Sequence, residues 1–151
     1  MLRQQLSDSL KKAMLGKDAP TVSTVRLILA ALKDRDIAAR PKGLADGIPE
    51  DEILSMLQGM VKQRKESIEL YKQGNRQDLV DKEAGEIVII EKFLPAKMSD
   101  ADTQAAITET ITAIGAQGLK DMGRTMAALK EKFPGRMDFT KASALVKQQL
   151  G

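Results

Sequence analysis

Apolar residues recur every three or four positions along most of the chain, which is typical of amphipathic helices. One apolar stripe covers residues 2–14, and Gly16 follows it where a helix would end. A second stripe covers residues 22–32 after Pro20, and a third covers residues 53–71 after three acidic residues that suit a helix N-terminus. A fourth helix is expected to begin near Arg76. The pattern predicts four N-terminal helices that close into a small bundle.

Two segments interrupt this pattern. Residues 39–49 contain two Pro and two Gly without periodicity, so we expect the most mobile loop of the first lobe there. Pro95 lacks a backbone N–H and disfavours helix in the residue before it, so the fourth helix should end at Phe93 or Leu94. Ser99 is then a good N-cap for the next helix, with Asp102 as its partner.

The segment around Pro95 has two interpretations. Residues 95–98 are either a hinge between two helical lobes or an ordinary turn inside one domain. Phe93, Leu94 and Met98 are expected to fill the junction. Beyond it, three shorter stripes near residues 107–114, 122–129 and 145–150 predict three more helices, and no strand pattern is found. We therefore predict an all-α fold with a four-helix lobe (1–94), a hinge (95–98) and a three-helix lobe (99–151).

The composition excludes several kinds of chemistry. The 151 residues include no Cys, no His and no Trp, and only 3% are aromatic. Thiolate chemistry, histidine acid–base chemistry and base stacking on aromatic platforms are therefore not expected. Neither phosphate-binding glycine motif, GxxxxGK[ST] or GxGxxG, occurs. We predict no catalytic residue, metal site or cofactor. No apolar run is long enough for a membrane span and no signal peptide is recognisable, so a cytoplasmic protein is expected.

Positive charge is concentrated near the C-terminus. Residues 115–151 contain seven basic and three acidic side chains, which gives a net charge of +4. Residues 1–94 contain 16 basic and 15 acidic side chains, which gives a net charge of +1. A basic lobe indicates a polyanionic partner, although Lys and Arg also commonly do no more than solvate helix surfaces. The candidate RNA-binding residues are Lys120, Arg124, Lys130, Lys132 and Arg136.

Arg64 is expected to have a structural role. It lies on or near the buried seam of the third helix, where an unpaired guanidinium would be costly. Glu83 interrupts the apolar ladder of the fourth helix and is the leading candidate partner, with Glu86 as the alternative. On the same helix, Lys62 with Glu66 and Lys65 with Glu69 are spaced to pair.

Several segments resemble the YqeY family over nearly the whole chain. They are VKQRKES at 61–67, GNRQDL at 74–79, EKFLPAKMSD at 91–100 and KDMGRTMAAL at 120–129. The resemblance implies an N-terminal helical bundle and a small lobe similar to the tail domain of the B subunit of the glutamine-dependent tRNA amidotransferase. Gly123, Met126 and Gly135 match that tail's pattern. Gly123 is expected to allow close helix packing.

The resemblance implies tRNA association and not chemistry. The amidotransferase is a carbon–nitrogen ligase that uses glutamine as its amide donor, and its catalytic cradle is not found in this chain. We therefore expect a tRNA-binding or accessory module that is not catalytic by itself, acting with tRNA, amidotransferase subunits or an aminoacyl-tRNA synthetase. The alternative is a protein–protein adaptor unrelated to RNA, which docks a partner helix between its lobes. Eight Met and the proline-bounded hinge favour it.

Overall fold

The computed structural model describes all 151 residues and contains seven α-helices, two short 3-10 helices and no strand. The all-α prediction is therefore confirmed. No helix has both the length and the apolar character needed to cross a membrane. The elements are α1 (Leu2–Leu15), α2 (Ala19–Ala39), η1 (Arg40–Lys42), α3 (Glu50–Gln73), α4 (Gln77–Glu91), α5 (Asp100–Ile114), η2 (Leu119–Asp121), α6 (Met122–Lys132) and α7 (Phe139–Leu150).

The chain forms two compact units, a first unit of Met1–Pro95 and a terminal unit of Ala96–Gly151. Phe93 and Leu94 pack against the core of the first unit, and Met98 packs against the core of the terminal unit. Each of the three apolar residues expected at the junction thus contributes to the core of its own unit.

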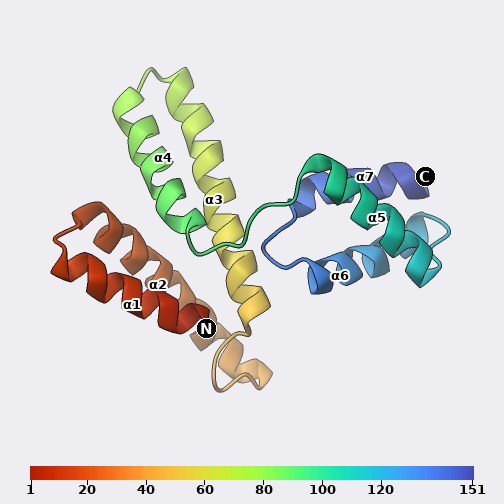
Figure 1. Cartoon of the computed structure of the whole chain (residues 1–151), viewed down its shortest axis with the longest axis horizontal. Helices are drawn as coiled ribbons and strands as arrows, with labels where there is room; N and C mark the ends of the chain where they lie inside the picture. Colours follow the sequence, from red (N-terminus) through yellow and green to blue (C-terminus); the bar gives the residue numbers. More distant parts are fainter. The chain divides into compact units, whose positions relative to one another are not determined.

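The first unit consists of two antiparallel helix pairs, α1 with α2 and α3 with α4 (Figure 1). Helix α2 also contacts α4, which joins the pairs. Their apolar stripes meet in one core, which includes Leu6, Val25, Ile28, Leu57 and Ile90, each completely buried. Asp18 caps α2 by accepting hydrogen bonds from the backbone N–H and the hydroxyl of Thr21. These bonds lower the pKa of Asp18.

The end of α4 differs from the prediction. The helix ends at Glu91, two or three residues before the expected Phe93 or Leu94. The backbone N–H groups of Lys92, Phe93 and Leu94 instead bond to the carbonyls three residues earlier. The chain therefore tightens into 3-10-like turns before Pro95, and a change of helix type is not visible in the apolar spacing.

The segment at 39–49 is more ordered than its composition predicts. It includes η1, and Gly43 and Gly47 have the left-handed φ values of +88° and +97° that favour glycine. Ile48 is buried, its N–H donates to Asp36 (2.9 Å), and its carbonyl accepts from Arg3 (2.8 Å). The end of this loop is therefore fixed to α1 and α2.

The terminal unit packs α5, α6 and α7 around a second core. Ser99 caps α5 as predicted, because its Oγ accepts from Asp102 N–H at 3.1 Å. Gly135 has φ +76° in the turn between α6 and α7, which explains a glycine there. Asp138 caps α7 through the N–H groups of Thr140 and Lys141. The fully buried core residues are Ile107, Leu129, Met137, Ala142 and Val146.

Candidate nucleic-acid interface

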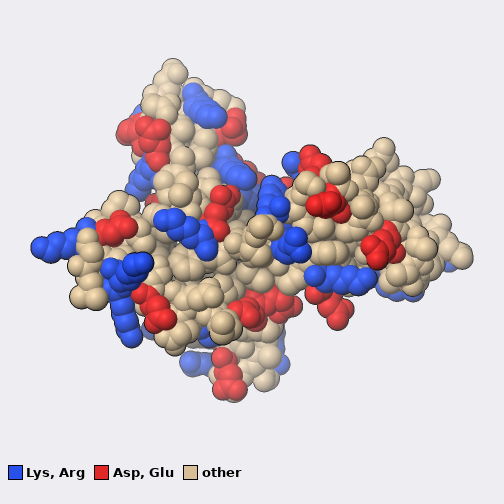
Figure 2. All heavy atoms as spheres, in the orientation of Figure 1, with Lys and Arg blue, Asp and Glu red and all other residues tan.

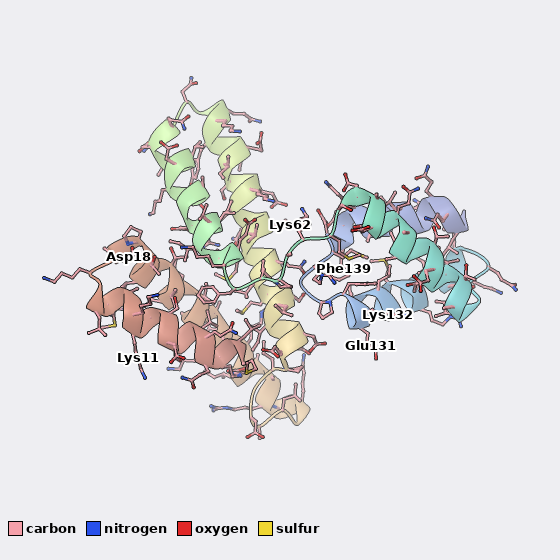
Figure 3. All side chains as sticks on the ribbon, in the orientation of Figure 1. Lys11, Asp18, Lys62, Glu131, Lys132 and Phe139 are labelled. Carbon is pink, nitrogen blue, oxygen red and sulfur yellow. The ribbon has the colours of Figure 1, made fainter.

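The five candidate RNA-binding residues are all exposed on the terminal unit. They lie in or beside α6: one in the 3-10 helix before it, one in its first turn, two in its last turn and one in the following turn. In chain order these are Lys120, Arg124, Lys130, Lys132 and Arg136. Figure 3 marks Lys132 beside Glu131 at the end of α6, so an acidic group lies next to this cation.

Arg124 has an acidic neighbour. Its Nη2 donates to Oδ1 of Asp121 at 3.2 Å, while Oδ2 of Asp121 accepts from the Gln117 backbone N–H at 2.9 Å. The bond from Gln117, together with the charge of Arg124, lowers the pKa of Asp121. Asp121 therefore fixes the turn before α6 and partly neutralises Arg124.

Two further cations also have neighbours within the unit. Lys130 Nζ lies 6.0 Å from the ring centroid of Phe139, at the limit of a cation–π contact. Arg136 Nε donates to the Ala96 carbonyl at 3.4 Å, and the Arg136 carbonyl accepts from Met98 N–H at 2.9 Å. Arg136 thus ties the start of the terminal unit to the turn after α6. Lys120 and Lys132 have no ion-pair or ring partner.

Gly123 does not have the packing role that was predicted for it. It is exposed in the first turn of α6, and a Cβ built there would meet no atom within 4 Å. Helix packing therefore does not require a glycine at this position. Because the glycine has no side chain, the space beside it on the outside of the unit is open. Lys120 and Arg124 lie before and after this glycine in the sequence.

Half of the acidic residues of this unit lie on α5, which carries Asp100, Asp102 and Glu109 and no basic residue. The face of the terminal unit visible in Figure 2 shows acidic and basic groups side by side and no continuous basic surface. The acidic residues of α5 would repel a polyanion, and the cations around α6 are interspersed with Asp121 and Glu131.

Arg64 is a structural residue, with a correction to its partner. Its Nε donates to Oε2 of Glu86 at 2.8 Å, whereas the predicted Glu83 is 4.0 Å away. On the same helix, Glu69 forms its ion pair with Lys72 (3.6 Å) and not with Lys65. Arg64 and Glu86 therefore form the close pair between α3 and α4, with Glu83 at its edge.

Comparison with known proteins agrees with the resemblance found in the sequence. The family model described as Yqey-like protein matches residues 3–150. The chain belongs to this family. The match covers both units, so the first and terminal units belong to one family pattern.

Three curated relatives come from yeasts and share the name "Altered inheritance of mitochondria protein 41, mitochondrial". Those of Lachancea thermotolerans and Kluyveromyces lactis are 35% and 34% identical over 109 residues, which is 71% of this chain and 56% and 57% of the relatives. That of Saccharomyces cerevisiae YJM789 is 39% identical over 89 residues, 59% of this chain and 46% of the relative. The match thus spans about half the length of these relatives.

These names correct the predicted location. A cytoplasmic protein was expected from the lack of a signal peptide and membrane span, but the relatives are named as mitochondrial proteins. The prediction was wrong because it relied on features that were missing from the sequence, and such features do not identify a compartment.

Sequence reasoning missed the cluster of Arg3, Asp36 and Ile48 in the first unit. Arg3 donates two hydrogen bonds to Asp36, at 2.6 and 2.8 Å. Asp36 continues the apolar stripe of Val25 and Leu32 at helical spacing, so an acidic residue in line with an apolar stripe was the available signal.

Proposed function

We propose that the chain is a non-catalytic accessory protein that binds tRNA through its terminal unit. The observation that most supports this is the uncovered Gly123 at the start of α6, with the exposed Lys120 and Arg124 on either side of it in the sequence. Cations attract the phosphate backbone, and a position without a side chain lets that backbone come close. The resemblance of Gly123, Met126 and Gly135 to the amidotransferase tail also supports tRNA as the polyanion.

We extend the proposal to the protein partner. A tRNA-binding module without catalytic groups acts beside an enzyme that uses the same tRNA, so an amidotransferase subunit or an aminoacyl-tRNA synthetase is the expected neighbour. The isolated chain is then expected neither to hydrolyse glutamine nor to amidate glutamyl-tRNA. Turnover that persists through repurification of the chain would contradict the non-catalytic role.

The decisive measurement is the affinity of the full chain for labelled tRNA at several salt concentrations. Each phosphate contact releases counterions, so log affinity should fall with log salt by roughly 0.7 to 0.9 per contact. Binding is expected to be in the micromolar range or weaker at about 0.1 M salt, because no group is arranged to recognise bases. No measurable affinity, or a slope near zero, would contradict the proposal and favour an adaptor unrelated to RNA.

A further inference from the structure

Helix α2 carries apolar residues on two opposite faces, of which only one is covered. Val25, Ile28 and Leu32 lie in the core of the first unit. On the opposite face, Leu27 and Ile37 are each 46% exposed, with the small, exposed Ala30 between them. A helix that is apolar on both sides is normally covered on both sides. We call the uncovered side the outer face of α2.

The outer face continues into a groove at the start of α2. The groove has a volume of about 720 Å³ and is lined by Met14, Lys17, Ala19, Val22, Ser23, Arg26 and Leu27. Met14 is 52% exposed, so the apolar lining is open to solvent and does not enclose a small molecule. Met14 is a flexible side chain that can adapt to the shape of a partner. Figure 3 marks the adjoining turn between α1 and α2 at Asp18.

One edge of the outer face is basic. Lys17 and Arg26 line the groove, and Lys33 lies seven residues after Arg26, on the same side of α2. None of these three cations has an ion pair. Asp36 is paired with Arg3, whereas Asp18 is hydrogen-bonded to the neutral Thr21 and keeps its charge next to Lys17 in the sequence. Asp34 lies seven residues after Leu27, on the outer face itself. The outer face is therefore bordered by three cations that form no ion pair, and it carries a single acid, Asp34.

We propose that the outer face of α2 docks an amphipathic helix of a partner protein whose apolar stripe is bordered by Asp or Glu. The apolar stripe would cover Leu27, Ala30 and Ile37, and the acidic border would pair with Arg26 and Lys33. From Ala19 to Ile37 the face is about 27 Å long, which corresponds to a partner helix of about 18 residues. This is the recognition of a helix by an apolar surface with charge complementarity at its edge.

Two other occupants fit the face less well. In an antiparallel two-fold pair of α2 helices, the edge that carries Arg26 and Lys33 would meet the same edge of the second copy, and like charges would repel. A membrane surface would be attracted by the cations, but a flat bilayer does not fill a groove as the ridge of a helix does. An acidic amphipathic helix satisfies both the shape and the charge.

The test uses the full chain and two designed 18-residue helical peptides with the same Leu stripe. One peptide has Glu at the flanking positions and the other has Lys. The Glu peptide should bind at least about tenfold more tightly by fluorescence anisotropy, and the Leu27→Glu variant should lose at least about tenfold of that affinity. The matched control is Leu70→Glu, which changes an exposed leucine of α3 outside the groove and should leave the affinity unchanged.

A charge exchange makes the test specific. The double variant Arg26→Glu with Lys33→Glu should prefer the Lys peptide, while its helix content by circular dichroism stays that of the native chain. Equal affinity for the two peptides, or no exchange of preference, would overturn the proposal. So would tighter binding to phosphatidylglycerol vesicles than to the Glu peptide, or a doubled mass of the chain alone that Leu27→Glu restores to a monomer.

Discussion

Arg64 donates from Nε to Glu86 across the α3–α4 helix pair at 2.8 Å. Only 13% of the Arg64 side chain and 15% of the Glu86 side chain are exposed, and Arg64 Nη1 also donates to the Met60 carbonyl at 3.2 Å. Both charged groups are therefore largely removed from solvent. A charge in such surroundings stabilises the fold only while its partner is present.

We therefore expect Glu86→Gln to lower the free energy of unfolding by about 1 to 3 kcal/mol, because Arg64 would lose its close carboxylate. Urea unfolding followed by circular dichroism measures the change. Glu83→Gln is the matched control and should cost less than about 1 kcal/mol, because Glu83 is 4.0 Å from Arg64. A larger loss of stability in the Glu83 variant than in the Glu86 variant would contradict this prediction, because Glu83 would then be the more important partner of Arg64.

The Arg3–Asp36 pair makes the first unit sensitive to acid. Hydrogen bonds from Arg3 are the main reason that the pKa of Asp36 lies below its usual value. The stabilisation is complete above the unfolded pKa of about 3.9, and it is lost as pH falls through the lower folded value. Asp36→Asn should therefore be less stable than the native chain at pH 7, and this difference should shrink below about pH 4.

Thermal unfolding of both proteins at a series of pH values measures this difference. Asp46→Asn is the matched control, since Asp46 is an exposed carboxylate in the loop that Arg3 and Asp36 hold. The control should follow the native chain. A difference between Asp36→Asn and the native chain that stays constant down to about pH 2 would show that ionisation of Asp36 does not stabilise the fold.

Gly47 is confined by the same pair. A Cβ at this position would lie 2.5 Å from Asp36 Oδ1 and 2.6 Å from Arg3 Nη2, whereas a Cβ at Gly43 would meet nothing within 4 Å. Both glycines have left-handed φ values. Gly43→Ala should cost only the backbone strain, about 1 kcal/mol, and Gly47→Ala should cost more and raise the pKa of Asp36 toward its usual value. Equal losses of stability in the two variants would contradict the predicted clash.

The sequence predicted features that depend on neighbouring residues better than features that depend on distant ones. The Ser99 cap and the end of α1 before Gly16 depend on short segments, and the structure contains both. The choice between Glu83 and Glu86 depends on how α4 is rotated against α3, which spacing alone does not determine. The Arg3–Asp36 pair joins residues 33 positions apart and forms only when α1 packs on α2.

The same limit applies to the candidate site. The exposure of the basic residues follows from their polar positions on α6 and in the turns before and after it. The contacts of Arg124 with Asp121 and of Lys130 with Phe139 depend on the turns before and after α6, whose geometry the apolar pattern does not describe. The open space at Gly123 could not be predicted, because a helical glycine is equally consistent with a tight contact and with none.

Gly123→Ala tests whether that space is used. Alanine is the better helix former, so the variant should gain about 0.5 to 1 kcal/mol of stability, and it should lose several-fold of its tRNA affinity. Gly59→Ala and Gly85→Ala are matched controls, since these helical glycines of the first unit also have no atom within 4 Å of a built Cβ. They should gain stability without loss of affinity. Unchanged tRNA binding by Gly123→Ala would show that RNA does not approach this turn.

The combined change of Lys120, Arg124 and Lys132 to Ala tests the cations of the terminal unit. It should flatten the slope of log affinity against log salt by about two to three, because each lost phosphate contact removes roughly 0.7 to 0.9. Arg124 must leave Asp121 to reach a phosphate, so the single change of Arg124 should have a smaller effect than that of Lys120 or Lys132.

The matched control for this triple variant changes Lys11, Lys12 and Lys42 to Ala. It removes the same charge from exposed positions of the first unit, none of which has an ion pair. If tRNA is held at the terminal unit, this control keeps the native slope while both variants keep the native helix content. If the affinity for tRNA instead depends only on the net charge of the chain, the two triple variants should flatten the slope equally. In that case the residues around α6 are not the tRNA-binding site.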